Sequence, residues 1–372
     1  MTILRSEIVE QQIDRATGRV GRFVKEVVLV RGEVPLSMVR KRSATGRSDR
    51  ATVLLVHGYG QNRYAWHLPS RSFVNHLANA GFDVFNLDLR GQGRSRKFGA
   101  PRPSVLAEYI EEDLPRAFEE VRRLSGRDDM FLVGHSLGGL ISYAAAPFAA
   151  QSIRGLVTIG SPFHFTQGSG ILRFFAQVVS TLDKAGIQVG NTSLPLRMLG
   201  RSMSALRGYL ESPLYPFKLR GWHAGAIEPE ILAEHLKYAF DIASVPVMLT
   251  MFRWSSGAFG GKVSGKSDGL SYAERFERCT MPLLVIAGTG DDLAPPDSVE
   301  PAYLLSRSPD KSYRELPLGH IDLLVGRDAP KTTWRMVERW IGERAARLHV
   351  AEAPTPSERR IQVALGGQED MP

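Results

Sequence analysis

The segment Gly134-His135-Ser136-Leu137-Gly138 places a hydroxyl between two glycines, a spacing suited to nucleophilic chemistry. Apolar residues run into this segment, and small residues at helical spacing follow it. A buried strand that turns sharply into a helix here would force strained backbone angles on Ser136, and glycines would leave room beside the turn. The strain would hold the hydroxyl at the carboxyl edge of a sheet, at a helix N-terminus. We therefore interpret Ser136 as a nucleophile.

A serine hydroxyl is a poor nucleophile at neutral pH, so Ser136 needs a base, and the base needs an acid to orient it. Of the nine histidines, His320 is the best candidate for the base. It comes just after Gly319, between a short strand and the last helix of the chain. His57 and His135 flank glycines in strand-end turns, and we assign them structural roles in packing or in hydrogen bonding to the loop backbone.

The orienting acid should also follow a strand, and two neighbouring carboxylates do so. Asp291 is the closer match to a strand-end acid in the pattern Gly-x-x-Asp-x-x-x-Pro, whereas Asp292 stays an alternative or a helper. Asp322 follows His320 too closely to orient it and is expected to brace the loop. The oxyanion of a tetrahedral intermediate needs donors, worth roughly 3 kcal/mol each. The backbone N–H groups of Leu137 and Tyr59 are suitably placed in the sequence.

An alternation of strands and helices must position these residues. Strands are expected at about 51–56, 82–87, 130–133, 155–160, 282–287 and 313–316, and helices at about 70–80, 104–124, after Ser136 and at 330–348. The alternation predicts an α/β fold with a parallel sheet covered on both faces. An antiparallel hairpin is expected at 22–42, at a sheet edge. Residues 1–21 are interpreted as a polar N-terminal extension with helical character.

The alternation is interrupted between 163 and 278, so the core is predicted to have two parts, 22–162 and 279–350. Amphipathic stretches at 171–179 and 229–240, an apolar run at 245–254 and a Gly/Ser/Lys segment at 255–269 predict a mainly helical cap insertion. Its large apolar side chains either line an acyl pocket or form the cap's own core, and they include Phe174, Phe175, Trp222, Met248, Met251, Phe252 and Trp254. Few apolar side chains occur in 351–372, which predicts a disordered tail.

Bulk properties exclude several classes of function. The chain has 372 residues and a formal net charge of +8, but its basic residues are not interleaved with aromatic residues as base stacking would require. No apolar run is long enough to span a bilayer, although peripheral contact with a lipid surface stays open. The single Cys279 fits a reducing compartment, so a cytoplasmic location is expected. His164, His223 and His235 in the predicted cap show no metal-ligand spacing with one another, so no metal site is predicted. The loop 88–95 is interpreted as a structural turn, and no cofactor is predicted.

Five motifs in order resemble those of the α/β-hydrolases. They are His57-Gly58-Tyr59-Gly60, Asp88-x-Arg90-Gly91-x-Gly93-x-Ser95, Gly134-x-Ser136-x-Gly138, Gly288-x-x-Asp291 and Gly319-His320. The resemblance spans about 22–348 and keeps the order Ser, acid, His. It implies a mostly parallel sheet of about eight strands and a Ser136–Asp291–His320 triad. The motifs also look similar to lipases and to polyhydroxyalkanoate-synthase-like members, although those synthases use Cys where this chain has Ser136. Haloalkane dehalogenases and epoxide hydrolases of this fold use Asp at the position of the nucleophile, so Ser136 argues against both activities.

The leading hypothesis is a serine carboxylic-ester hydrolase that acts through an acyl-enzyme on apolar acyl esters of small molecules or lipids. A second hypothesis is acyl transfer to a hydroxyl other than water, because the same triad serves both reactions. A third is a non-catalytic ligand-binding homologue on a hydrolase scaffold. Hydrolysis of amides, lactones or carbon–carbon bonds also stays open, because the cap decides the substrate.

Overall fold

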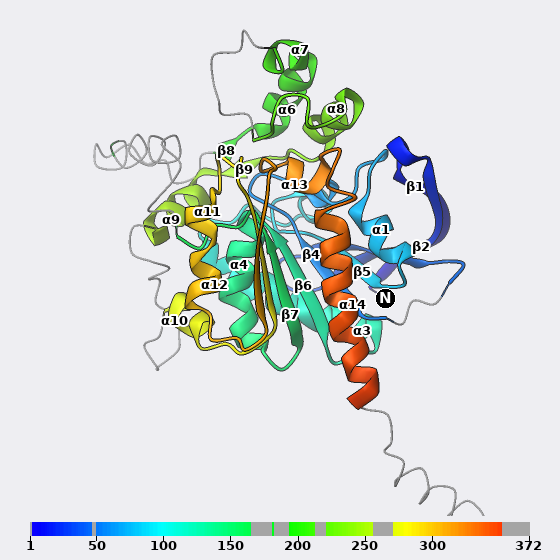
Figure 1. Ribbon diagram of the computed structural model, residues 1–372, viewed down its shortest axis with the longest axis vertical. Helices are drawn as coiled ribbons and strands as arrows, with labels where there is room; N and C mark the ends of the chain where they lie inside the picture. Colours follow the sequence, from blue (N-terminus) through cyan, green and yellow to red (C-terminus); the bar gives the residue numbers. More distant parts are fainter. Residues whose placement is uncertain are drawn as a thin grey trace, which may run out of the picture.

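A nine-stranded sheet forms the centre of the molecule in the computed structural model, which describes residues 2–46, 50–164, 181, 193–212, 221–255 and 271–351 (Figure 1). The strand order is β1-β2-β3-β5-β4-β6-β7-β10-β11. The first three strands pair antiparallel with their neighbours, whereas all pairs from β5 to β11 are parallel. The strands are β1 (Ile3–Asp14), β2 (Arg19–Val30), β3 (Leu36–Ser43), β4 (Thr52–Val56), β5 (Asp83–Asp88), β6 (Met130–His135), β7 (Ile153–Ile159), β10 (Leu283–Gly288) and β11 (Lys311–Leu316).

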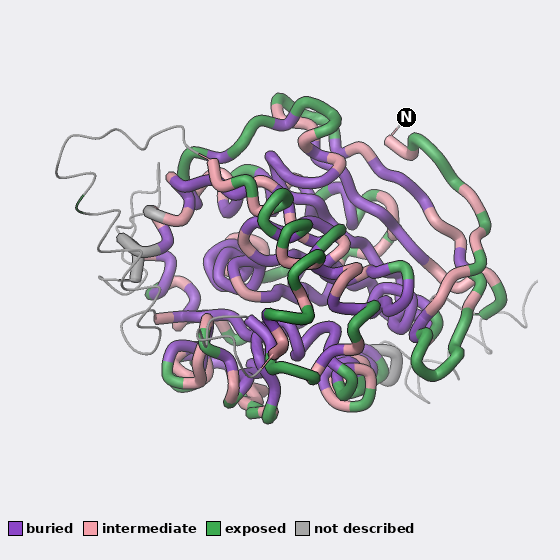
Figure 2. Tube along the Cα trace, turned by 90° about the horizontal axis from the view of Figure 1, so that it is seen from above, coloured by how far each residue is buried: buried purple, intermediate pink, exposed green. Residues whose placement is uncertain are grey.

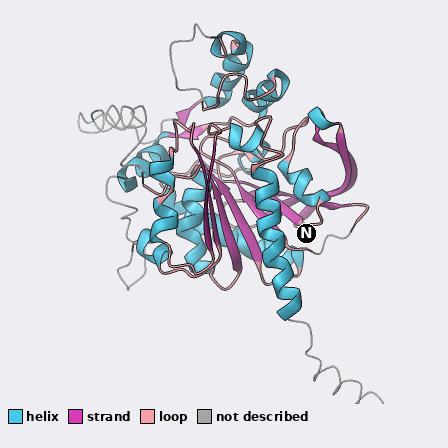
Figure 3. Ribbon diagram, in the orientation of Figure 1, coloured by secondary structure: helices cyan, strands magenta, loops and turns pink. Residues whose placement is uncertain are grey.

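Helices cover both faces of this sheet, as the strand–helix alternation predicted (Figure 3). The core helices are α1 (Phe73–Asn79), α2 (Gly93–Lys97), α3 (Leu114–Ser125), α4 (Leu137–Ala145), α11 (Pro296–Val299), α12 (Pro301–Leu305), α13 (Asp322–Val325) and α14 (Thr333–Ala351). Short helical turns lie at η1 (Arg15–Thr17), η2 (Arg63–Ala65), η3 (Glu108–Asp113, a π-helix) and η4 (Ala146–Ala149). Pro115 lies in the first turn of α3, which continues directly from the π-helix η3.

Two apolar cores form because successive side chains of a strand point to opposite faces. In β4, Val53 and Leu55 join the core under α1 and α14, whereas Leu54 and Val56 join the core under α3 and α4. All five residues of β4 are buried, as expected for a parallel strand with both faces covered. Buried residues make up most of the trace inside the molecule, whereas exposed residues lie along its outer edge and on the part of the chain nearest the viewer (Figure 2).

The N-terminal segment differs from its prediction. Residues 1–21 were expected to have helical character, but Ile3–Asp14 is strand β1, so the sheet has nine strands where about eight were expected. The hairpin predicted at 22–42 is confirmed as β2 and β3, yet β1 occupies the edge. Strand β1 lacks a clear alternation of apolar and polar residues, because much of both of its faces is exposed to solvent. Charged residues can therefore stand on it, such as Glu7, which pairs with Lys25 of β2 at 2.9 Å.

The segment between β7 and β10 contributes β8 (Ser193–Leu194), α6 (Leu196–Ala205), α7 (Arg207–Leu210), α8 (Pro229–Tyr238), β9 (Ala243–Ser244), α9 (Val245–Ser255) and α10 (Tyr272–Glu277). Helices α6 to α8 lie beyond the carboxyl edge of the sheet, on the side of α13 (Figure 1). The predicted stretches 171–179 and 256–269, with Phe174 and Phe175, lie outside the described residues, as does the tail from 352. Across the described ranges, no helix has the length and apolar character needed to cross a bilayer.

Candidate active site

Ser136 occupies the turn between β6 and α4, and its backbone is strained. Its φ of 54° and ψ of −123° make it the sole residue other than glycine with a positive φ among those described. The chain packs so closely here that a Cβ on Gly138 would lie 2.2 Å from the Val56 carbonyl oxygen, and one on Gly134 would lie 2.5 Å from the Gly139 nitrogen. Larger residues at these two positions would push the turn apart, which explains the glycine spacing.

Asp291 and His320 form a hydrogen-bonded pair at the ends of β10 and β11. Nδ1 of His320 lies 2.7 Å from Oδ2 of Asp291, and both side chains are buried. Oδ1 of Asp291 accepts the backbone N–H groups of Leu293 and Ala294, each at 2.8 Å. Asp292 is exposed, so Asp291 is the one of the two candidate acids that contacts the imidazole.

Backbone and ring contacts connect this pair to the Ser136 turn. Ser136 donates its N–H to the Ile159 carbonyl at 3.0 Å, at the end of the neighbouring strand β7. The next residue, Gly160, has a φ of 52°, and a Cβ there would lie 3.1 Å from Oδ2 of Asp291 and 3.3 Å from Nδ1 of His320. Nε2 of His135 lies 3.2 Å from the His320 carbonyl oxygen. The adjacent strands β6, β7, β10 and β11 therefore bring all three predicted triad residues to one edge.

The loop after β4 lies beside the Ser136 turn. A Cβ on Gly58 would lie 3.1 Å from Cβ of Ser136, so the loop that carries Tyr59 passes close to the hydroxyl. The N–H of Gly58 donates to Oε1 of Gln61 at 3.2 Å, and the Tyr59 hydroxyl donates to the Ser244 carbonyl at 2.7 Å. Leu137 is the first residue of α4, so its N–H has no acceptor within the helix and can donate to another group.

His57 and His135 have the structural roles that the sequence suggested. Nε2 of His57 accepts the Leu89 N–H at 3.1 Å, so its Nδ1 carries the proton and donates to the Gly58 carbonyl at 3.0 Å. Burial lowers the pKa of His57, which keeps this ring neutral. Burial, followed by the proximity of His320, lowers the pKa of His135 well below its usual range.

Asp322 braces the His320 loop, as predicted. Its Oδ2 accepts the N–H of Gly319 at 3.0 Å and that of His223 at 2.9 Å. Burial raises the pKa of this carboxyl. Because His223 belongs to the segment between β7 and β10, Asp322 also attaches that segment to the loop.

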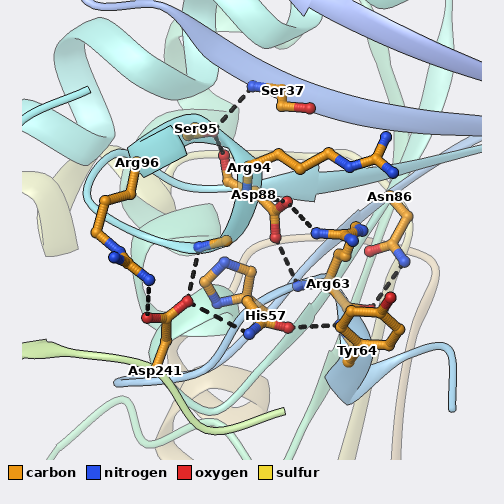
Figure 4. Close-up of polar contacts among 12 residues, drawn as sticks. Ser37, His57, Arg63, Tyr64, Asn86, Asp88, Arg94, Ser95, Arg96 and Asp241 are labelled. Carbon is orange, nitrogen blue, oxygen red and sulfur yellow. Dashed lines mark hydrogen bonds and ion pairs between the residues drawn. The ribbon is translucent and has the colours of Figure 1, made fainter. Parts of the chain in front are cut away.

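The Gly-rich loop at 88–95 is a turn held by protein groups (Figure 4). Asp88 accepts the N–H of Arg63 and that of Arg94, and its other close partner is the Arg63 guanidinium at 2.8 Å. Asp241 accepts the Gly93 N–H at 2.8 Å and pairs with Arg96 at 3.0 Å. No pattern in the sequence indicates a role for Asp241, because its contact with Gly93 joins residues that are 148 positions apart in the chain.

Among the described side chains, no group of three or more His, Cys, Asp or Glu residues is arranged so that it could hold a metal ion. Burial raises the pKa of the Cys279 thiol to about 11, and its Sγ donates to the Arg275 carbonyl. A thiol with this pKa is a poor nucleophile at neutral pH.

Known proteins resemble this chain in sequence over most of its length, at low identity. The chain is 26% identical over 335 residues to a poly(3-hydroxyalkanoate) polymerase subunit of Allochromatium vinosum, covering 86% of this chain and 88% of that protein. The corresponding subunit of Haloferax mediterranei is 24% identical and covers 88% of this chain, which spans 65% of that subunit's length. Gastric triacylglycerol lipase of Mus musculus is 23% identical, with 82% of this chain and 83% of the lipase covered.

Solved structures agree at the level of the fold. The monoacylglycerol lipase of Paleococcus ferrophilus superposes with a TM-score of 0.54 at 21% identity, covering 83% of this chain and 99% of that one. An esterase from Thermogutta terrifontis superposes with a TM-score of 0.53 at 17% identity, covering 87% and 99%. Residues 51–326 match the family model of the alpha/beta hydrolase fold, so the chain belongs to the α/β-hydrolase family.

Proposed function

We propose that the protein is a serine hydrolase of carboxylic esters, with Ser136 as nucleophile, His320 as general base and Asp291 as the acid that orients it. The observation that carries the proposal is the 2.7 Å contact between His320 and Asp291 at the edge where Ser136 is held at a φ of 54°. With Nδ1 of His320 donating to the carboxylate, Nε2 is left as the basic nitrogen.

The reaction follows from these roles. Nε2 of His320 takes the Ser136 proton as Oγ attacks the ester carbonyl, and the N–H groups of Leu137 and Tyr59 stabilise the oxyanion. Collapse of the intermediate expels the alcohol, which takes the proton from His320, and leaves an acyl-enzyme. Water then attacks with His320 as base again, and the acid is released.

The substrate is proposed to carry an apolar acyl group that binds under a cap formed by 163–278. Trp222, Val247 and Met251 are buried, and this segment contributes to the apolar cores on both faces of the sheet. Three relatives, named as a triacylglycerol lipase and as poly(3-hydroxyalkanoate) polymerase subunits, support the proposal. The polymerase relatives also favour a second candidate, acyl transfer to an acceptor hydroxyl.

The Ser136→Ala variant tests the nucleophile. It should lose hydrolysis of p-nitrophenyl esters and labelling by a fluorophosphonate, and it should keep the circular dichroism spectrum and melting temperature of the wild type. Retained turnover would refute the assignment, and failure of the wild type to label would favour a non-catalytic binder. An acyl-chain series tests the pocket, because a preference for acetate over octanoate argues against an apolar tunnel. Product analysis with added alcohol separates transfer from hydrolysis.

A further inference from the structure

A small polar cavity of about 90 Å³ lies under the N-terminal hairpin, away from Ser136. Strands β1, β2, β3 and β5 contribute to its lining, together with η2, α1 and α2. The charged and titratable side chains that face it are those of Lys25, Lys41, Arg63, His67, Tyr64 and Arg94. No carboxylate belongs to the lining, so the cavity is strongly cationic.

Lys41 is the least compensated of these cations. Its side chain is 0% exposed, and its ammonium contacts Oε1 of Gln11, Oδ1 of Asn75 at 2.7 Å and Nε2 of His67 at 3.2 Å. All three acceptors are neutral, since His67 accepts at Nε2 and its Nδ1 lies 2.6 Å from the Ser72 hydroxyl. A buried ammonium without a counter-charge costs several kcal/mol. Burial accordingly lowers the pKa of Lys41 well below its usual range.

The neighbouring carboxylates are already engaged. Glu7 pairs with Lys25 at 2.9 Å and Asp88 with Arg63 at 2.8 Å, which compensates two of the four cations. Arg94 is half-buried, and within the described residues its guanidinium has no carboxylate partner. Figure 4 shows the Arg94 side chain extending toward the side of Arg63 and Asn86. In this cavity Arg94 therefore carries a positive charge without a counter-charge, and Lys41 adds a second one when it is protonated.

One acceptor on the wall narrows the choice of anion. Oδ1 of Asn86 is buried and has no hydrogen-bond partner among the described groups, while its amide donates to the Arg63 carbonyl at 2.9 Å. A fully deprotonated anion has no O–H group that could donate a hydrogen bond to Oδ1 of Asn86. Inorganic hydrogen phosphate keeps one O–H at neutral pH, because its last proton is lost only in strongly alkaline solution. It can donate to Asn86 while its other oxygens accept from the cations.

We propose that this cavity is a binding site for one phosphate-type oxyanion, held by Arg94 with Arg63 and Lys25 and balanced by Lys41. The site has a direct connection to the catalytic edge. Arg63 follows the loop that carries Tyr59, and both its N–H and its guanidinium hold Asp88. Occupancy by the anion would therefore support the loop beside Ser136 without contacting substrate.

Thermal unfolding and calorimetric titration test the site. Inorganic phosphate should raise the melting temperature of the wild type by several degrees over sodium chloride at equal ionic strength. Arg94→Gln should weaken phosphate binding at least about tenfold, because it removes a charge-assisted donor. Lys97→Gln is the matched control, since Lys97 lies on the same helix and is exposed but does not line this cavity. It should bind phosphate as the wild type does.

Three outcomes would overturn the proposal: a wild type that responds equally to phosphate and chloride, an Arg94→Gln variant with wild-type affinity, or equal weakening by Lys97→Gln. Sulfate that binds as tightly as phosphate would refute the assignment to hydrogen phosphate. Glycerol phosphate loses its last phosphate O–H at about pH 6, so at about pH 8 it should bind more weakly than inorganic phosphate, and equally tight binding would refute the donation of an O–H to Asn86.

Lys41→Met keeps the proposal testable if Arg94→Gln fails to fold. This variant removes the uncompensated charge, so it should melt higher than the wild type in phosphate-free buffer and lose the response to phosphate. A Lys41→Met variant that keeps the full response to phosphate would contradict the proposal.

Discussion

Asp88 and Asp291 are two buried carboxylates at the same edge of the sheet, and they are built alike. Asp88 ends β5 and accepts the backbone N–H groups of Arg63 and Arg94 at 2.8 and 2.9 Å. Asp291 follows β10 and accepts those of Leu293 and Ala294, both at 2.8 Å. Each has one further close side-chain partner, which is a guanidinium for Asp88 and an imidazole for Asp291.

The partner decides what each carboxylate can do. A guanidinium keeps its proton at any physiological pH, so the pair of Asp88 with Arg63 is a permanent ion pair that fixes two loops. An imidazole gains and loses a proton near neutral pH, so the pair of Asp291 with His320 can stabilise a charge that appears only during a reaction. We therefore expect loss of Asp291 to affect turnover and loss of Asp88 to affect stability.

The largest effect is expected from Asp291→Asn. The amide keeps the shape of the side chain but holds the His320 ring in the wrong tautomer, so kcat should fall roughly 10⁴-fold. Steady-state ester hydrolysis measures the loss. Asp292→Asn is the matched control: this neighbour is exposed and should leave kcat within about twofold of the wild type. A larger loss in Asp292→Asn than in Asp291→Asn would reverse the assignment.

Asp88→Asn should instead lower the free energy of unfolding by about 3–5 kcal/mol, because it leaves the Arg63 guanidinium buried without its partner. Urea unfolding followed by circular dichroism measures this change. Residual folded enzyme should turn over far more than Asp291→Asn does. If Asp88→Asn kept wild-type stability and lost turnover, the two carboxylates would not differ as their partners suggest.

A smaller effect extends the comparison to a buried imidazole without a carboxylate partner. His235 is fully buried, and burial lowers its pKa from 6.5 to about 4. Because the folded state binds this proton less tightly than the unfolded state, the stability that His235 contributes is complete above pH 6.5. It is lost as the pH falls through about 4, to a total of about 3 kcal/mol.

Urea unfolding at pH 7 and at pH 4 measures this acid sensitivity. The His235→Gln variant, which cannot take up the proton, should lose less stability between the two pH values than the wild type. An equal loss in both proteins would show that His235 is not held neutral by burial.

Sequence patterns predicted the parts of this molecule where local chemistry dictates structure. The glycines around Ser136 are required by the turn itself, and Asp291 follows the buried apolar strand β10. His320 follows the more polar, partly exposed strand β11. The roles of these three residues stay a proposal until the variants are measured. Strand β1 was not predicted, because its charged residues obscure the alternation of apolar and polar side chains that marks a strand. Asp241 was not predicted, because its contacts come from segments far away in the sequence. Nothing in the sequence indicated that Lys41 is buried, because a lysine in a strand is ordinarily exposed.

The pairing of β7 with β10 also bears on how such a protein can diversify. Leu156 lies opposite Leu283 in this parallel pair, although the segment 163–278 separates the two strands in the sequence. The entropy lost in closing a loop grows only with the logarithm of its length, so doubling such an excursion costs about 0.6 kcal/mol. Segments of very different length can therefore be exchanged at this point at little expense in folding free energy, while the contact between Asp291 and His320 stays in place.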